Sequence, residues 1–317
     1  MVPEAIVNIL KESGSFVIAS HINPEGDAIG STLALGLGLL KAGKRVYLYN
    51  KDGVPESLRF LPFSELITSE LPDESFEVLI IVDCGSLKRI GTDKINCKSF
   101  AIVDHHLPDS DISAAKWIVP EAAATGELVF KILKHLNVDI DQAIAENLYT
   151  SILTDTGSLR YPNTTSETLR IMAELMETGI NTWDINRTIY ENVPLRRLKL
   201  LGASLATLQI DGSIGWITVT DEMYKATGSK AEDTEELANI PRKVHGVEVA
   251  IFFRQKDAST FKISLRSKDQ VNVAAIARQF GGGGHFHAAG CTVEGNLEDI
   301  QLQLIMAVKN ALKELSN

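Results

Sequence analysis

The first half of the chain alternates short apolar runs with longer stretches of helical length, and this alternation constrains the fold more than any other feature. The apolar runs, which we predict to be strands, occupy residues 15–20, 45–50, 76–85 and 99–106. Helical stretches occupy residues 26–44, 124–136, 144–159 and 166–179. Strands that alternate with helices are typical of parallel sheets, whose strands need long crossover connections. We therefore predict an α/β fold with a doubly wound, mostly parallel sheet and helices on both faces.

The second half of the chain has a different pattern. Residues 182–209 are largely helical but contain Pro194, and we interpret them as a connector. Partial period-two alternation then predicts antiparallel strands at 213–220, 247–255 and 260–267. A helix at 272–280, a glycine run and an amphipathic helix at 297–315 complete a second, smaller α+β domain. The predicted organisation is a first domain at 1–190, a helical connector at 191–209 and a second domain at 210–317.

Charge and cysteine content exclude some classes of protein. The net charge of −10 argues against a broad surface for long duplex nucleic acid, which needs clustered cations, but allows short phosphorylated ligands. The three cysteines, Cys84, Cys97 and Cys291, lack CxxC spacing, which argues against a disulfide framework and against a thiolate zinc site. The chain has no basic-then-apolar leader and no apolar run of about 18 residues. We expect a cytoplasmic protein that does not contact a membrane.

Side chains that bind metals stand where the predicted elements end. They are His21, Glu25 and Asp27 after the first strand, Asp83 after the third, Asp104, His105 and His106 after the fourth, and Asp155 near the end of a helical stretch. The carboxyl ends of parallel strands share one edge of a sheet, so these groups would converge. Converged carboxylates repel one another unless a cation neutralises them. The pattern therefore predicts a metal site at this edge.

The types of side chain indicate which metal and how many ions. Carboxylates and imidazoles without a thiolate suit Mn²⁺ and, less specifically, Mg²⁺, Fe²⁺ or Zn²⁺. The carboxylates outnumber what one ion needs, so we predict two ions about 3.5–4 Å apart with a bridging carboxylate, an arrangement that activates water against phosphoryl groups. Taken singly, each residue is more often a turn former or a helix cap than a ligand, and Asp27 could cap the helix that follows it. The prediction depends on the set recurring on successive elements.

Five stretches together resemble a known family. "HINPEGDAIGS" (21–31), "VDCGS" (82–86), "VDHHLPD" (103–109) and "LTDTGSLRYPNTT" (153–165) resemble, in order, the motifs of the DHH phosphoesterases. "FGGGGHFHAAGC" (280–291), preceded by "SLRSK" (264–268), resembles the signature of the DHH-associated C-terminal domain. The size and order of the domains are most similar to the branch of nanoRNases and 3′-phosphoadenosine 5′-phosphate phosphatases.

The resemblance implies a role for each site residue. One ion would be held by His21, Glu25 and Asp83, and the other by Asp27, Asp83, His105 and Asp155, with Asp83 bridging. In the catalytic set of Asp83, Asp104 and His106, His106 would face the substrate phosphate and Asp104 would orient the neighbouring histidines. Glu25 departs from the pattern, because the family usually has aspartate there. Glutamate keeps the charge but is one methylene longer, so the metal that the site prefers is not determined by the resemblance.

Further residues are candidates for binding the substrate. Four consecutive glycines at 281–284 are entropically costly, and they allow backbone N–H groups to approach an anion closely. The candidates are Gly282, Gly283, Gly284, His285 and Arg266, with Arg160 and Asn163 near the metals. The alternatives are a hairpin or helix-capping turn for the glycine run and a solvated loop for Arg160 and Asn163. The basic cluster at 196–199 is interpreted as a solvated helix face.

The resemblance implies a manganese-dependent phosphodiesterase and phosphatase. It would hydrolyse short oligoribonucleotides to mononucleotides, with 3′-phosphoadenosine 5′-phosphate as a second substrate that would yield AMP. The alternatives are hydrolysis of cyclic dinucleotides or of linear dinucleotides of the pApA type, and pyrophosphatase or polyphosphatase activity. A different class of protein, a catalytically degenerate nucleotide-binding module, is suggested only by Glu25. A homodimer is compatible with such a fold.

Overall fold

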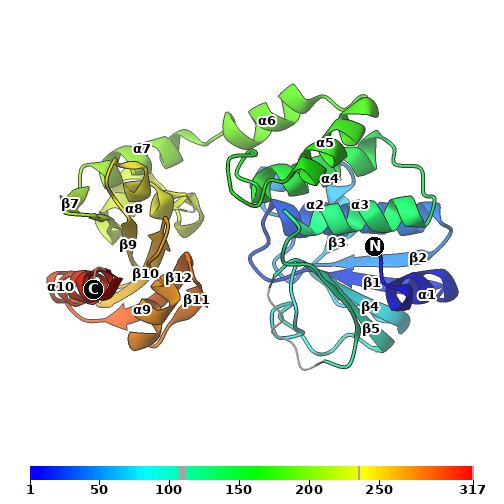
Figure 1. The fold of residues 1–317 in the computed structure, drawn as a ribbon, viewed down its shortest axis with the longest axis horizontal. Helices are drawn as coiled ribbons and strands as arrows, with labels where there is room; N and C mark the ends of the chain where they lie inside the picture. Colours follow the sequence, from blue (N-terminus) through cyan, green and yellow to red (C-terminus); the bar gives the residue numbers. More distant parts are fainter. Residues whose placement is uncertain (107–111, 235, 316–317) are drawn as a thin grey trace. The chain divides into compact units, whose positions relative to one another are not determined.

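The computed structural model describes residues 1–106, 112–234 and 236–315, and the chain divides into two units, Met1–Asn192 and Val193–Asn317 (Figure 1). The first unit contains a six-stranded sheet of order β3-β2-β1-β4-β5-β6, and every pair in it is parallel. Its strands are β1 (Ser15–Ala19), β2 (Arg45–Tyr49), β3 (Ile67–Thr68), β4 (Phe76–Val82), β5 (Cys97–Asp104) and β6 (Ala115–Ile118). The predicted α/β class and parallel sheet are confirmed.

The helices of the first unit all add buried side chains to one core. They are α1 (Glu4–Glu12), α2 (Gly26–Lys41), α3 (Thr125–His135), α4 (Gln142–Asp155), α5 (Ser166–Glu177) and α6 (Thr182–Tyr190), with short 3₁₀ turns η1 (Glu56–Leu58) and η2 (Ser64–Leu66). Among the described residues, the other face of the sheet is covered by segments without helix, which contribute side chains such as Ile90 and Ile95. The sequence predicted helices on both faces. The connection after β4 is instead an irregular loop whose isoleucines cover the strands.

The strand order places a topological switch point between β1 and β4. The chain leaves β1 towards β2 and β3 on one side, and then returns to β4 and β5 on the other. The loops that follow β1 and β4 therefore diverge at the carboxyl edge of the sheet, and ligands bind in such crevices. Buried residues on both faces of β1 explain why its sequence is a continuous apolar run.

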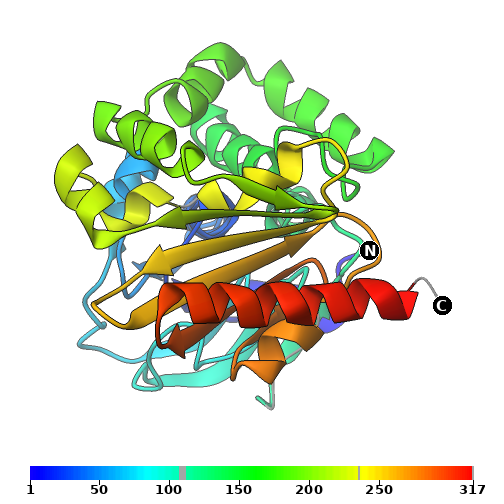
Figure 2. The ribbon, with the colours of Figure 1, turned by 90° about the vertical axis from the view of Figure 1, so that its left-hand side faces the viewer.

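The second unit contains a mixed six-stranded sheet of order β11-β12-β10-β9-β8-β7. The strands are β7 (Gln209–Asp211), β8 (Ile214–Val219), β9 (Val249–Gln255), β10 (Thr260–Ser267), β11 (Gly283–His285) and β12 (Ala288–Glu294). The helices are α7 (Leu195–Leu205), α8 (Asp221–Thr227), α9 (Val273–Gln279) and α10 (Leu297–Leu315), with 3₁₀ turns η3 (Ala231–Thr234), η4 (Leu237–Asn239) and η5 (Pro241–Lys243). Helices α9 and α10 cover one face of this sheet (Figure 2).

One prediction for the second unit is wrong. The strands predicted at 213–220 and 247–255 were expected to be antiparallel, whereas β8 and β9 pair in parallel, with Ile217 opposite Phe252. The long segment between them holds α8 and three 3₁₀ turns and forms the crossover that parallel strands require. Period-two alternation shows only that one face of a strand is buried. It is the same in parallel and antiparallel strands, so it cannot predict the direction of pairing.

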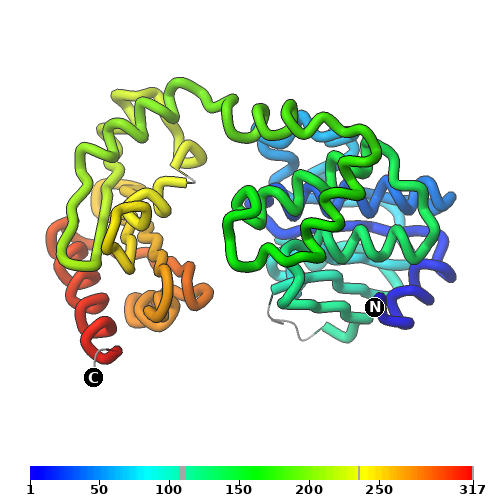
Figure 3. The backbone as a smooth tube through the Cα atoms, turned by 45° about the horizontal axis from the view of Figure 1, so that its top comes forward, coloured from blue at the N-terminus to red at the C-terminus, as the bar shows by residue number. Residues whose placement is uncertain are grey.

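The chain passes from the first unit to the second between α6 and α7, as the tube in Figure 3 shows. Helix α6 contributes Ile185 to the first core, and α7 contributes Leu200 to a core of the second unit. Pro194 is the residue before α7, a position where its missing N–H costs no helical hydrogen bond. In the described residues, no helix combines the length and the apolar character that crossing a membrane would require.

Candidate functional site

Asp27 lies in the first turn of α2 and is 3% exposed. Its Oδ1 accepts hydrogen bonds from the hydroxyls of Ser31 (2.9 Å) and Ser151 and from the backbone N–H of Gly126 (3.1 Å). Its Oδ2 accepts one from the backbone N–H of Thr125 (2.7 Å). These donors stabilise the ionised carboxylate in a buried position. Oδ2 accepts one of these hydrogen bonds and Oδ1 accepts three, so Oδ2 retains more capacity to bind a further group.

Asp83 directly follows β4 and has a left-handed backbone with φ of 59°. Residues other than glycine adopt this conformation infrequently, and such residues are found both in turns and at functional sites. The carboxylate is 3% exposed, with Oδ2 3.3 Å from His21 Nε2 and Oδ1 3.7 Å from His105 Nε2. Burial, and then the nearby charge of Asp27, raise the pKa of Asp83 well above its ordinary value. Its two oxygens thus face different histidines, as a bridging carboxylate requires.

His105 follows β5, and carboxylates surround one of its nitrogens. Its Nδ1 lies 3.1 Å from the carbonyl oxygen of Ala122, so it carries a proton to donate. Its Nε2 lies 3.6 Å from Asp27 Oδ2, 3.5 Å from Asp155 Oδ2 and 3.7 Å from Asp83 Oδ1. Burial opposes protonation of His105, but the charges of Asp27, Asp155 and Asp83 outweigh it and raise its pKa to about 8.

The remaining members of the cluster are Asp104, His106 and Asp155. Asp104 is fully buried, and its Oδ1 accepts from the backbone N–H of His106 (3.0 Å) and lies 2.8 Å from His106 Nδ1. Burial raises the pKa of Asp104, but these hydrogen bonds outweigh it and the net pKa is lowered. Asp155 is the last residue of α4, and burial together with the charge of Asp27 raises its pKa to about 7.

The cluster contains two groups whose potential ligand atoms lie within 4.8 Å of one another: Asp83, His105 and His106, and Asp27, His105 and Asp155. His21 joins through its contact with Asp83. Glu25 is exposed as the residue before α2 and belongs to neither group, although its charge helps to raise the pKa of Asp155. The structure thus brings together every predicted metal ligand except Glu25. The end of the "VDHHLPD" motif, residues 107–109, lies outside the described residues.

The chemistry of this set fits a divalent cation. His105 Nε2 is buried without a hydrogen-bond partner, and its lone pair points into carboxylate oxygens when the ring is neutral. An acceptor among acceptors needs a proton or a metal ion between them. Oxygen and imidazole donors without sulfur suit Mn²⁺ and similar ions. These residues are therefore candidate metal ligands.

The two substrate candidates of the first unit, Asn163 and Arg160, have structural partners. Asn163 Nδ2 donates to the carbonyl oxygens of Ala123 (2.9 Å) and Asp155 (3.2 Å), so this side chain connects the end of α4 to the segment before α3. Arg160 is exposed, and its Nε donates to the carbonyl oxygen of Gly157. Asn163 thus supports the backbone of a candidate ligand.

In the second unit, strand β12 lies between β10 and β11. Arg266 of β10 and His285 of β11 are both paired with Ala288 of β12, so the two residues flank the same position of that strand. Added Cβ atoms at Gly282 and Gly284 would lie 2.1 Å from Gly290 O and 2.5 Å from Ala288 O. These two glycines allow β11 to approach β12, so a packing role explains them. At Gly283 a Cβ would meet nothing within 4 Å.

Sequence reasoning missed the donors around Asp27 and Asp83. The sequence did not predict the donors to Asp27, which are Ser31, Ser151, Thr125 and Gly126. Thr125 also contacts the second carboxylate, because its Oγ1 donates to Asp83 Oδ1 (3.2 Å). A signal was present, because Ser151 precedes Asp155 by four residues and therefore lies on the same face of α4. Hydroxyl and backbone N–H donors from three separate helices cannot be assigned to one carboxylate without the fold.

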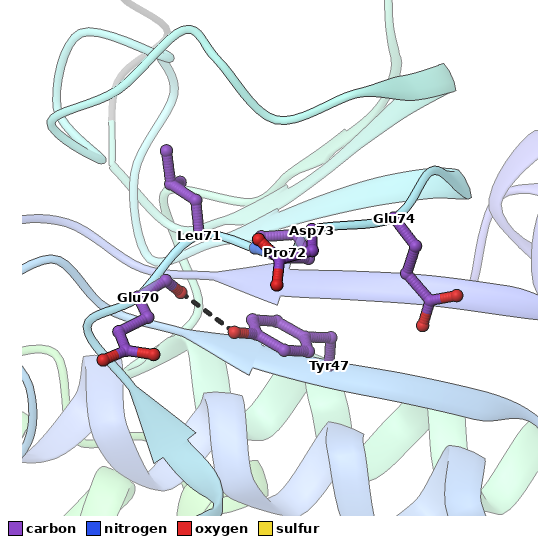
Figure 4. A pocket seen from close by; sticks show the side chains of 6 residues that line it. All are labelled: Tyr47, Glu70, Leu71, Pro72, Asp73 and Glu74. Carbon is purple, nitrogen blue, oxygen red and sulfur yellow. Dashed lines mark hydrogen bonds between the residues drawn. The ribbon is translucent and has the colours of Figure 1, made fainter.

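A separate pocket lies beside β2 and is lined by Tyr47, Glu70, Leu71, Pro72, Asp73 and Glu74 (Figure 4). Tyr47 Oη donates to the carbonyl oxygen of Glu70 (3.0 Å). The lining has three acidic side chains and includes no predicted site residue. Such a pocket repels phosphate groups, and we assign no role to it.

Comparisons with known proteins identify the family of each unit. Residues 15–152 match the DHH family, N-terminal domain, and residues 220–314 match the DHHA1 domain. The chain is 32% identical to the bifunctional oligoribonuclease and PAP phosphatase NrnA of Thermus thermophilus, over 97% of this chain and 93% of that protein. It is 24% identical to NrnA of Bacillus subtilis, over 88% and 89%.

A solved structure agrees over nearly the whole chain. The crystal structure of an exopolyphosphatase-related protein from Bacteroides fragilis superposes with a TM-score of 0.87 at 29% identity, covering 98% of this chain and 94% of that one. The resemblance inferred from the motifs is confirmed. The chain belongs to the DHH family, a family of phosphoesterases, and carries a DHHA1 domain in its second unit.

Proposed function

We propose that this protein is a manganese-dependent phosphoesterase that hydrolyses short oligoribonucleotides to mononucleotides and removes phosphate from 3′-phosphoadenosine 5′-phosphate. The observation that carries the proposal is the unpartnered Nε2 of His105, which faces Asp27, Asp83 and Asp155. Support for the substrate class comes from the NrnA relatives, which are named for these two activities.

The contacts support the ligand sets that the family resemblance implies. Asp83 would bridge two ions, one held with His21 and the other with Asp27, His105 and Asp155. Glu25, the third ligand that the family resemblance implies for the first ion, is exposed in this structure. Divalent ions held in this way would activate a water molecule for in-line attack on phosphorus and offset the charge of the phosphate oxygens.

The protein's own residues would orient the reacting groups. Asp104 accepts from His106 Nδ1, which orients the ring, and His106 would face the substrate phosphate. The acceptor at Ala122 fixes the tautomer of His105 and directs its Nε2 at the cluster. Arg266 and His285 of the second unit would bind phosphate or ribose groups of the substrate, since both side chains can donate to anionic oxygens.

The test is release of mononucleotides from a 5′-labelled RNA ladder with Mn²⁺, beside phosphate release from 3′-phosphoadenosine 5′-phosphate. Asp83→Asn keeps the size of the side chain and removes its charge, and we expect a loss of about 100-fold or more. Asp139→Asn is the matched control, because that carboxylate is 92% exposed and pairs only with Lys41 in the contacts described. Wild-type protein that turns over neither substrate with any divalent ion would contradict the proposal.

A further inference from the structure

The hydroxyl of Ser151 differs in its hydrogen bonding from most other hydroxyls of neighbouring helices. Thr32, Thr154 and Thr156 each donate to a backbone carbonyl four residues earlier, the usual partner in a helix. Ser151 instead donates across to Asp27 Oδ1, a carboxylate on another helix. The residue is fully buried. Because this buried hydroxyl donates to a carboxylate on another helix and not to a carbonyl of its own helix, it can orient that carboxylate.

The packing around Ser151 keeps the three helices close. An added Cβ at Gly126 of α3 would lie 2.0 Å from Ser151 Oγ, and one at Gly30 of α2 would lie 2.4 Å from Asn147 O of α4. The helices can meet at this point only because glycine stands at both positions. Ser151 Oγ also lies 3.4 Å from Ser31 Oγ, so two hydroxyls share one carboxylate oxygen.

Ser151 and Asp155 lie one helical turn apart on α4. The bond to Asp27 therefore fixes the helix that carries Asp155, while it also orients Asp27 itself. Both carboxylates face His105 Nε2, at 3.6 Å and 3.5 Å. We propose that Ser151 is a positioning residue that sets the distance between the Asp27 and Asp155 ligands of one metal ion. This inference rests on the proposed function, because it assumes that the cluster binds metal.

Ser31 provides the matched comparison. It donates to the same Oδ1 of Asp27, but it lies on the same helix as Asp27, so its loss does not release α4. Ser151→Ala should weaken Mn²⁺ binding about 10–100-fold, the range found when a group that orients a metal ligand is removed. Ser31→Ala should weaken it clearly less. Ser151→Cys keeps the size of the side chain with a weak donor and should resemble Ser151→Ala.

The measurement is titration of chelator-treated protein with Mn²⁺, with free Mn²⁺ followed by electron paramagnetic resonance, beside thermal melts of the metal-free variants. Activity of Ser151→Ala should be lost at low Mn²⁺ and return at high Mn²⁺, a rescue that a purely structural role would not give. Equal affinities of Ser151→Ala and Ser31→Ala would overturn the inference while the proposed function stands. Wild-type protein that binds no Mn²⁺ would overturn the proposed function itself. If Ser151→Ala does not fold, Ser151→Cys decides by the same titration.

Discussion

Single residues at the site are held in states that carry a free-energy cost, and for His105 a proton or a bound cation offsets it. Asp83 has a left-handed backbone, and His105 Nε2 has carboxylate oxygens on several sides. Each feature costs free energy in the metal-free protein, since strain and buried like charges both destabilise a fold. Such costs remain where function requires the geometry. The pKa values of His105 and Asp155 make these costs measurable.

Without metal, the protein should lose stability as pH rises from about 6 to about 9. The folded-state pKa of His105, about 8, lies above its ordinary 6.5, so the stability from its protonated ring is present at low pH and is lost through about 8. Asp155 has a pKa of about 7 against 3.8, so its protonation favours the folded state and is lost through about 7. Thermal melts in a chelator should therefore show a falling Tm.

The control for this prediction is Asp155→Asn, which removes one of the two groups and should flatten the decline between about pH 6 and about pH 7. Mn²⁺ binding should strengthen over the same range, because the ion displaces the protons of His105 and Asp155. A Tm of the metal-free protein that rises from pH 6 to pH 9 would contradict the assignment of these pKa values.

At the residue scale the sequence predicted the candidate ligands that the structure brings together, but it did not predict their surroundings. His21, Asp27, Asp83, His105 and Asp155 were predicted as a set because each ends or begins an element at one edge of the sheet. The left-handed φ of Asp83 was not predicted. Neither were the hydrogen bonds that Ser151 and Thr125 donate to Asp27, because they join segments far apart in the chain. Glu25 showed the limit of a motif, since sequence spacing does not determine where a flexible side chain points.

At the scale of elements, the sequence predicted the strands and helices that have a clear hydrophobic period. It predicted poorly the features that depend on which strands pair, such as the direction of β8 and β9. The buried strands β1, β2, β4 and β5 were predicted, whereas β3, with two residues, and β6, with four, are too short for a periodic signal. The basic cluster at 196–199 was expected to be a solvated helix face. Arg196 of α7 instead forms an ion pair through its Nε with Asp233 Oδ2 at 2.9 Å, and Asp233 is 4% exposed.

This ion pair should matter for the second unit alone. Arg196→Ala leaves the buried Asp233 carboxylate without its cation and should lower the free energy of unfolding of this unit by about 2 kcal/mol, less than for a fully buried pair because Arg196 is partly exposed. Arg197→Ala is the matched control, since its partner Glu236 is 70% exposed and the pair spans 3.8 Å. That loss should stay below about 0.5 kcal/mol. Equal losses in urea unfolding would contradict the argument.

The whole molecule has separate cores for its two units. The clusters on both faces of the first sheet draw only on residues up to Ile189, and those of the second sheet only on residues from Leu200 onward. The predicted metal ligands all belong to the first unit. A domain with its own core can unfold as its own cooperative unit. Metal binding then stabilises only the unit that holds the ions.

Calorimetry of the full chain should therefore show two transitions, and Mn²⁺ should raise the temperature of one of them. With Mn²⁺ at about 100 times its dissociation constant, the stabilisation should be about 2.7 kcal/mol per independent site. Asp83→Asn should abolish the shift, and Arg196→Ala should move only the transition that Mn²⁺ leaves unchanged. Two transitions that both rise with Mn²⁺, or a single one that moves as a whole, would mean that the units are energetically coupled despite their separate cores.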